Sequence, residues 1–317
     1  NNMTYLSSNQ LKQYEDEGFV SPINIFSKYK AKQIRDEIEL IEKEMPGELE
    51  KSGRYNAHLI SPLLDDVTHN PKILDAVQSL IGQNILVCGT TLFIKNPHEK
   101  GFVSYHQDAK YIGLEPLNWV TAWVAITDSN EHNGCMRMWA GSHKENLKQH
   151  DQKFNEGNLL TRGQTVKDVP REETTPLILT AGQMSLHHPT VVHGSDLNKS
   201  DDRRIGFVIQ SYIGTNVKQV LGKNGVQLAR GKDSFNYHEN VTRPVELMNE
   251  KDIKQLTIDY KQTFGSESGE KVLEDLKKRC SFNSTTHIKG DSHESAYLEG
   301  ARSAVLFINN MLNKKEK

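Results

Sequence analysis

The order of apolar and polar residues divides the chain into a helical start, a strand-rich middle and a mixed end. Residues 1–80 have a helical character. Within them, Ser7 opens a capping box, which predicts a short helix that begins there and ends at Gly18. Isoleucines at helical spacing predict a second helix over 27–44, and Pro71 at a first helical position predicts a third.

From residue 84 the pattern changes to short runs rich in β-branched and aromatic residues, which are typical of strands. No regular helices separate these runs, so an antiparallel barrel or sandwich is expected over 84–214 rather than a doubly wound sheet. Residues 144–175 are polar and interrupted, which indicates a long insertion of the kind that often forms a functional lid. The predicted strands are 85–94, 103–106, 119–126, 136–139, 177–179, 183–187, 190–193 and 204–213.

The pattern after Gly214 is mixed and contains no internal repeat. Amphipathic spacing predicts helices over 249–263, 270–279 and 295–312. We therefore expect one domain over 1–317, with a helical N-terminal part, a β core and a mostly helical extension over 215–317.

Composition narrows the class of protein. Hydrophobic residues make up 36% of the 317 residues and charged residues 25%, which is ordinary for a globular protein with a sizeable core. The net charge of −2 gives no basic field for nucleic acid or an anionic membrane. No apolar run approaches the ~18 residues needed to span a bilayer, and no signal peptide is expected at the start. Three cysteines without a CxxC pair favour reduced thiols, so we expect a cytoplasmic protein.

The most informative motif is His106-Gln107-Asp108, followed much later by His193. Two imidazoles and one carboxylate form the facial triad that binds Fe(II) and leaves open coordination positions. Residues two apart on an extended strand share a face, so His106 and Asp108 can reach one metal while Gln107 points elsewhere. His193 would come from a neighbouring strand.

A pair of arginines follows the second histidine. Arg204 lies eleven residues after His193, on the next apolar strand, and a guanidinium suits bidentate binding of a carboxylate. Arg203 precedes it, so a shift of one residue in register would exchange the two. His187 and His188 compete for the third ligand position, but Pro189 should break the strand after them. They are expected to be core histidines or to support the ligands.

Several blocks in 84–214 resemble the phytanoyl-CoA dioxygenase family, a branch of the Fe(II)/2-oxoglutarate oxygenases. The resemblance implies a double-stranded β-helix, or cupin-like jelly roll, closed over a metal with helices packed outside it. The blocks are Leu92-Phe93-Ile94-Lys95, Tyr105-His106-Gln107-Asp108, Thr121-Ala122-Trp123-Val124-Ala125, Glu131-His132-Asn133-Gly134-Cys135-Met136-Arg137, Gly141-Ser142-His143 and His193-Gly194-Ser195 through Arg203-Arg204.

The family pattern also implies roles for single residues. His106, Asp108 and His193 would bind Fe(II), and Arg204 would hold the distal carboxylate of the co-substrate 2-oxoglutarate. O2 would be the second co-substrate. Three further positions align with the lining of the co-substrate pocket, and Thr121 could join them by strand parity; the three are Lys95, Gln107 and Trp123. Because related halogenases have a small residue at the position of Asp108, its carboxylate favours hydroxylation over chlorination.

Blocks at 158–164, 182–188 and 229–233 are similar to bacterial members that act on amino- or trimethylammonio-phosphonates. Arg162 and Arg230 could face such an anionic substrate, although each could equally form a surface salt bridge. Tyr111 could close the pocket.

We therefore expect a dioxygenase that hydroxylates an unactivated C–H bond of a small polar metabolite, acting as a monomer or homodimer. One alternative is a substrate tethered to coenzyme A or a carrier protein, which would need a basic rim. The basic residues of the insertion are offset there by acidic ones. Another alternative is a cupin-like metalloprotein without 2-oxoglutarate, which would keep the triad but not require Arg204.

Overall fold

The chain divides into two compact units, Asn1–Val245 and Glu246–Lys317, and each is described by itself. No helix among the described residues is long and apolar enough to cross a membrane. The expectation of a single domain over 1–317 stays a prediction. The computed structural model describes residues 6–44, 55–151, 153, 156–160, 164–245, 258–280, 282, 305–306, 308–309 and 312–313.

The predicted N-terminal helices are present in the first unit. The first, α1 (Ser8–Glu17), has Ser7 as its N-cap, both hydrogen bonds of the capping box, and Gly18 in the left-handed conformation at its end. The isoleucine stripe of α2 (Lys28–Glu44) is buried, as its spacing predicted. Pro71 starts α4 (Pro71–Ile81) after an Asn70 cap. A shorter helix, α3 (Pro62–Thr68), and a 3₁₀ turn, η2 (Ala57–Leu59), complete this part.

The N-terminal part is not wholly helical, because Phe19–Asn24 forms a strand, β1. It pairs antiparallel with β10 (Gln183–His187), about 160 residues further along the chain. Phe19 is 1% exposed and joins the apolar cluster between the sheets. Burial of this side chain at the sheet edge therefore stabilises the segment as a strand.

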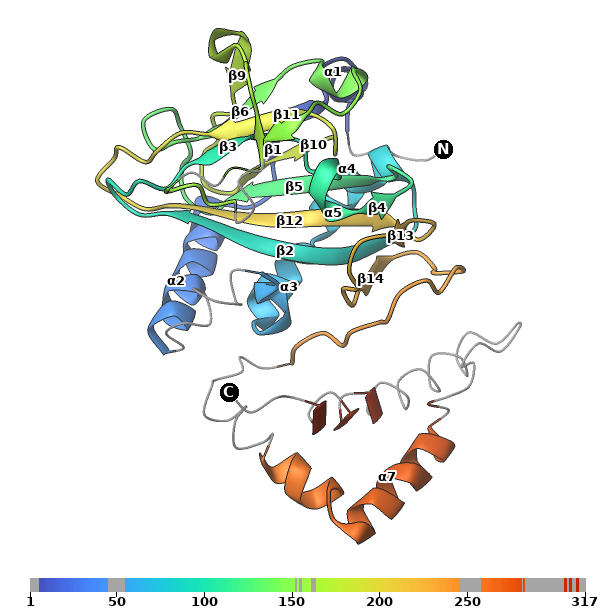
Figure 1. Cartoon of the computed structure of the whole chain (residues 1–317). Coiled ribbons are helices and arrows are strands. Elements are labelled where there is room, and N and C mark those ends of the chain that lie inside the picture. The colour runs from blue at the N-terminus through green and yellow to red at the C-terminus, as the bar shows by residue number, and fades with distance from the viewer. Residues whose placement is uncertain are drawn as a thin grey trace. The chain divides into compact units, whose positions relative to one another are not determined.

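The core consists of two antiparallel sheets, which confirms the predicted β fold class. The six-stranded sheet has the order β1-β10-β5-β12-β2-β14, and the four-stranded sheet β3-β11-β6-β9. Figure 1 shows the smaller sheet above the larger one, with α2 and α3 on the opposite side of the larger sheet. The remaining strands of these sheets are β2 (Ile85–Lys95), β3 (Val103–His106), β5 (Trp119–Ala125), β6 (Met136–Trp139), β9 (Thr174–Pro176), β11 (Val192–Ser195), β12 (Arg204–Gly214) and β14 (Gln227–Arg230).

Two strand predictions need correction. The strand expected at 177–179 lies at Thr174–Pro176 instead, where it pairs with β6. The strand expected at 190–193 runs over Val192–Ser195, so His193 lies within it rather than at its end. The break expected at Pro189 is present between β10 and β11.

The insertion and the end of the first unit contain short local elements. Within 144–175 a two-stranded ladder forms from β7 (His150–Asp151) and β8 (Thr165–Val166). The part of the predicted helical extension over 215–245 carries strands instead, because β13 (Lys218–Gln219) pairs with β4 (Leu114–Glu115) and β14 pairs with β2. Short elements also flank these parts, namely α5 (Ala109–Ile112), η3 (Ser142–Lys144) and η4 (Arg171–Glu173).

The described part of the second unit is helical. A helical segment covers 258–264, and α7 (Glu267–Arg279) agrees with the helix predicted from 270. The structure does not describe residues 249–257 of the predicted 249–263 helix. Most of the helix predicted over 295–312 also lies outside the described residues.

Candidate metal and co-substrate site

Two histidines face each other across the smaller sheet. His106 ends β3, and His193 on β11 is its direct antiparallel partner. Their ring centroids lie 4.2 Å apart. Cross-strand pairing therefore brings together two imidazoles that are 87 residues apart in the chain.

Both rings are oriented by the backbone. The Nδ1–H of His106 donates to the carbonyl oxygen of Ser104 at 2.8 Å, and that of His193 donates to the carbonyl oxygen of Val191 at 3.1 Å. This hydrogen bond fixes the tautomer in which Nε2 carries the free lone pair, the arrangement found in metal-ligating histidines.

Asp108 reaches the same point by a route that differs from the prediction. It is not on an extended strand, because its backbone is helical (φ −57°, ψ −43°) and it is the N-cap of α5. Its Oδ1 lies 3.2 Å from His106 Nε2 and 3.7 Å from His193 Nε2. The predicted convergence is present, but a turn after β3 produces it rather than strand parity.

The three side chains could hold one cation. Their donor atoms all lie within 4.8 Å of one another, and all three residues are buried. Burial lowers the pKa of His193 well below its usual value, which keeps the imidazole neutral and able to coordinate. Burial alone would raise the pKa of Asp108, but its interactions with the surrounding histidines outweigh burial and hold that pKa well below its usual range.

The second oxygen of Asp108 has its own partners on the larger sheet. His187 Nε2 lies 3.2 Å from Asp108 Oδ2, and Thr121 Oγ1 lies 3.1 Å from the same atom. The Thr121 hydroxyl also lies 2.9 Å from the backbone oxygen of Gln210, so its single proton serves one acceptor at a time. His187 thus supports the carboxylate, the type of role expected for it from the sequence.

The two adjacent arginines point in opposite directions. Arg204 is 1% exposed, donates to the carbonyl oxygen of Gly134 at 2.7 Å and lies 5.2 Å from the ring centroid of Trp123. Arg203 lies outside and forms a two-pronged ion pair with Glu42 of α2 at 2.7 and 2.8 Å. Of the two, it is Arg204 whose guanidinium lines the cavity that also contains the triad.

Lys95 lies opposite Arg204 in the strand register and is also buried. Its Nζ donates to Ser195 Oγ at 2.6 Å, to the carbonyl oxygen of Gly134 at 3.3 Å and to that of Asp196. Burial, and then the charge of Arg204, lower the pKa of Lys95 to about 6. Lys95 does not line the cavity itself, but Ser195 does.

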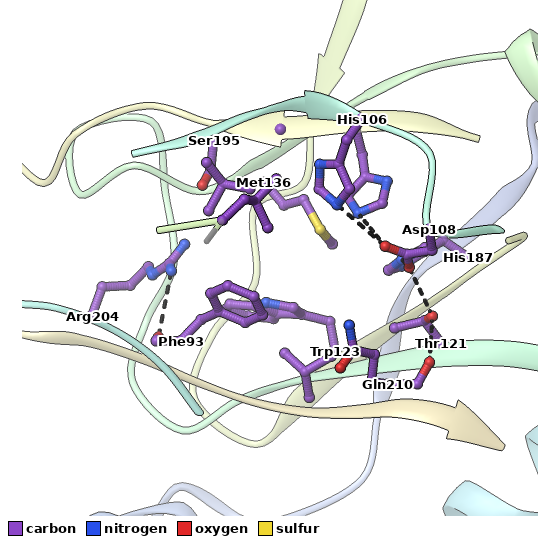
Figure 2. A pocket seen from close by; sticks show the side chains of 15 residues that line it. Phe93, His106, Asp108, Thr121, Trp123, Met136, His187, Ser195, Arg204 and Gln210 are labelled. Carbon is purple, nitrogen blue, oxygen red and sulfur yellow. Dashed lines mark hydrogen bonds and ion pairs between the residues drawn. The ribbon is translucent and has the colours of Figure 1, made fainter. Parts of the chain in front are cut away.

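Trp123 forms one wall of the cavity, as its position predicted. A Cβ atom at Gly206 on the neighbouring strand would lie 2.2 Å from the Trp123 ring. The glycine therefore lets the indole lie flat against β12, between Arg204 and the metal-binding side chains (Figure 2).

Gln107 does not lie in the cavity wall. Its side-chain amide donates to the carbonyl oxygen of Thr190 at 2.7 Å and accepts from the backbone N–H of Lys148 at 2.8 Å. Its backbone N–H donates to His150 Nε2 at 3.0 Å. Alternation at the end of β3 turns this residue away from the metal site. Its side chain instead links Lys148 of the insertion to Thr190, which lies between β10 and β11.

The predicted substrate residues lie elsewhere or outside the described part. Tyr111 packs edge-on against His150, with ring centroids 5.3 Å apart. Arg230 pairs with Asp75 of α4 at 2.6 Å, the surface salt bridge that was its alternative interpretation. Arg162 is outside the described residues.

The cavity has a volume of about 50 Å³ and extends from the triad to Arg204. The sequence interpretation did not include several of its wall residues, although strand parity with Lys95 could have identified Phe93. The other wall residues without a predicted role are Val103, Met136, Leu160, Gly194, Ser195, Val208 and Gln210.

Family comparisons agree with this geometry. The model of the phytanoyl-CoA dioxygenase family (PhyH) matches residues 14–206, more than half of the chain. A second model, that of Bbp19-like phage proteins, matches residues 260–317, within the second unit.

Comparisons with individual proteins also find oxygenases of this kind. The peroxisomal phytanoyl-CoA dioxygenase of Mus musculus is 28% identical over 284 residues, covering 82% of this chain and 80% of that protein. The structure of the non-heme monooxygenase ThoJ in its apo form has a TM-score of 0.67 and 30% identity, covering 77% of this chain and 92% of that one. CytC3 with Fe(II) and alpha-ketoglutarate shares the fold, with a TM-score of 0.59 at 22% identity over 79% of this chain and 98% of that one. The chain belongs to the phytanoyl-CoA dioxygenase family, whose members are non-heme, Fe(II)- and 2-oxoglutarate-dependent oxygenases.

Proposed function

We propose that this protein hydroxylates a C–H bond of a small polar metabolite. The observation that carries the proposal is a buried triad of metal donors and a buried guanidinium that line one cavity. A metal triad or a buried guanidinium alone has other uses in proteins. Together they match a dicarboxylate co-substrate that chelates the metal at one end and offers a free carboxylate to the guanidinium at the other.

The donor set fits Fe(II). His106, His193 and Asp108 supply two neutral imidazoles and one anionic oxygen, which leave coordination positions open for other ligands. When bound, Fe(II) supplies the activation of O2 that C–H hydroxylation requires. The protein contributes orientation: the Ser104 and Val191 carbonyls hold the rings, and His187 holds the outer carboxylate oxygen.

The other end of the cavity fits the distal carboxylate of 2-oxoglutarate. Arg204 offers a guanidinium already desolvated by Trp123 and the strand around it. A carboxylate there would also favour the charged form of the neighbouring Lys95, whose three oxygen acceptors match the three N–H donors of an ammonium group.

These features favour an oxygenase over the alternatives. A cupin-like metalloprotein without 2-oxoglutarate would not require the buried Arg204. The phosphonate proposal rests on the sequence resemblance alone, because Arg230 is engaged with Asp75 and Arg162 lies outside the described residues. A tethered acyl substrate remains a second proposal, supported by the names of the mammalian relatives. A cytoplasmic location and a monomeric or homodimeric state stay predictions.

The test is conversion of 2-oxoglutarate to succinate by protein loaded with Fe(II), first without substrate and then with a metabolite library. We expect slow release without substrate and faster release with the correct one. Direct binding of 2-oxoglutarate to the metal-loaded protein is measured in parallel. If the protein neither binds nor turns over 2-oxoglutarate, the proposed function is wrong.

A further inference from the structure

A second cavity lies next to the first one, and residues of β2 and β12 in the larger sheet line both. It has a volume of about 170 Å³, and Gln210 lines both cavities. On β2, Phe93 lines the first cavity and Gly89 the second. These residues share strand parity and are four apart, about 13 Å along a strand that rises ~3.3 Å per residue. The metal site therefore lies between the Arg204 end and this second cavity.

A β-bulge creates the boundary between the two cavities. On β12 the register shifts between Ile209 and Ser211 against β2, and between Ile209 and Tyr212 against β5. Gln210 is the extra residue. Bulges next to active sites commonly redirect a side chain, and here the bulge holds the Gln210 carboxamide at the junction.

The Gln210 carboxamide has one end fixed. Its Oε1 accepts from Thr91 Oγ1 at 3.0 Å, which orients the amide. Its backbone oxygen faces the Thr121 hydroxyl, which also faces Asp108. Figure 2 shows the Gln210 side chain below Asp108, beside Trp123. The Nε2 amino group of Gln210 makes no hydrogen bond to the residues that the structure describes, so a ligand at this junction can accept from it.

The wall of the second cavity is polar but carries no charge among the described residues that line it. Burial raises the pKa of the Cys88 thiol to about 12, so this side chain is also neutral. The lining residues Cys88, Thr90, Leu114 and Ser211 are buried, whereas Tyr55 and Asn224 are exposed and mark the side open to solvent. Its hydrogen-bonding side chains, besides Gln210, are Tyr55, Asn56, Thr90, Ser211, Gln219 and Asn224.

We propose that the second cavity binds the part of the substrate that does not react, and that this part is an uncharged hydrogen-bonding group such as an amide, hydroxyl or carbonyl. The inference rests on the proposed function for the identity of the first cavity. A phosphonate, carboxylate or ammonium group that packs against the buried part of this wall would lose hydration there without gaining a counter-charge, which is costly. A neutral polar group can exchange water for Gln210 and its neighbours at little net cost. Gln210 would then set the specificity and direct the substrate toward the metal.

The test compares four probes of similar size: pentanamide, pentanoate, pentyltrimethylammonium and pentylphosphonate. Each is titrated without O2 into full-length protein loaded with Fe(II) and 2-oxoglutarate, and binding is measured by calorimetry. We expect pentanamide to bind at least about tenfold more tightly than each charged probe, since tenfold corresponds to one good hydrogen bond of ~1.4 kcal/mol.

Variants locate the binding. Gln210→Leu removes the amide donors and should weaken pentanamide binding about tenfold. Its matched control, Gln33→Leu, makes the same change on the exposed face of α2 and should leave binding unchanged. Gly89→Ala and then Gly89→Val fill the second cavity progressively, because a Cβ there meets nothing closer than Asn56 Oδ1 at 3.5 Å. Pentanamide affinity should fall in that order.

The outcomes separate the two proposals. If 2-oxoglutarate binds but a charged probe binds as well as pentanamide, or none of the four binds, the inference is wrong and the proposed function stands. Unchanged pentanamide affinity in folded Gly89→Val protein also overturns the inference. If 2-oxoglutarate fails to bind while pentanamide binding depends on Gln210, the proposed function is wrong and the neutral site stands.

Discussion

The two cavities share one sheet but differ in chemistry. The first is built around buried ionisable groups, with Asp108 and the histidines at one end and Arg204 at the other. The second has hydrogen-bonding walls without charge among its described lining residues. Buried charges need fixed partners, and those partners narrow the range of ligands, whereas a neutral wall can bind many polar groups. The comparison suggests that the first cavity is specialised for metal and co-substrate and that the second sets substrate preference.

The largest effect is expected from Asp108→Ala, which tests whether the first cavity is the metal site. It removes the anionic metal donor and leaves the His187 Nε2 donor without its acceptor, while Thr121 keeps the Gln210 backbone oxygen. We expect Fe(II)-dependent release of succinate to fall by at least about 10³-fold, the scale of losing a group that stabilises the reacting centre. Metal content after dialysis is the second measurement. Asp201→Ala, at a fully exposed carboxylate, is the control, and an active Asp108→Ala enzyme would refute the ligand assignment.

The other end of the first cavity is tested by the adjacent arginines. Arg204→Leu should raise the KM for 2-oxoglutarate about 100-fold, because a charge-assisted hydrogen-bond pair contributes about 1.5–3 kcal/mol. Arg203→Leu is a matched control that breaks the Glu42 pair and should lower stability by about 1 kcal/mol without changing that KM. Steady-state kinetics and urea unfolding measure both. Equal KM effects in the two variants would contradict the assignment.

Substitutions of His187 test how far metal binding depends on a side chain that orients the metal ligand Asp108. His187→Phe removes the donor to Asp108 Oδ2 and should weaken metal affinity about 10- to 100-fold, the usual loss for a group that orients a ligand. His187→Gln retains an N–H donor and should recover part of that affinity. Metal titration by calorimetry is the measurement, and unchanged affinity in His187→Phe would mean that Asp108 is held without it.

The smallest expected effect concerns the wall of the second cavity. His58 Nδ1 lies 2.9 Å from Thr90 Oγ1, and burial, with the charge of His69, lowers the pKa of His58 to about 3. The unfolded chain therefore takes up this proton near pH 6.5 while the folded one does not. This contribution to stability is complete above about pH 6.5 and declines toward pH 3, by up to ~1.4 kcal/mol per pH unit.

His58→Gln should flatten that dependence. Urea unfolding at pH 7.0 and pH 5.0 measures it in both proteins, since the difference in free energy of unfolding between the two pH values should be smaller in the variant. If both proteins lose the same stability on acidification, His58 is not the group that titrates.

Local pattern was enough to predict the main parts of the site. The types and order of His106, Asp108, His193 and Arg204 indicated which side chains line one cavity, although Asp108 reaches it through the turn after β3 and not through strand parity. The sequence could not distinguish Arg203 from Arg204, since that choice depends on the register of β12 against β2 and on Glu42 of α2.

What escaped prediction depends on contacts between distant segments. β1 forms because a sheet edge 160 residues further on offers it a partner, which no local propensity reveals. The bulge at Gln210 depends on two neighbouring strands at once. Gln107 was expected in the co-substrate pocket, but its outward direction and its contacts with Thr190 and Lys148 give it a different task.

Gly206 has a consequence for how the co-substrate could be changed. A single added methyl group at this position would collide with the Trp123 ring and push the ring away from β12, into the cavity that it lines. The space between the triad and Arg204 would then narrow, while both ends of the cavity kept their binding groups. Gly206→Ala is therefore a position at which the choice of 2-oxo acid could be engineered without touching either end.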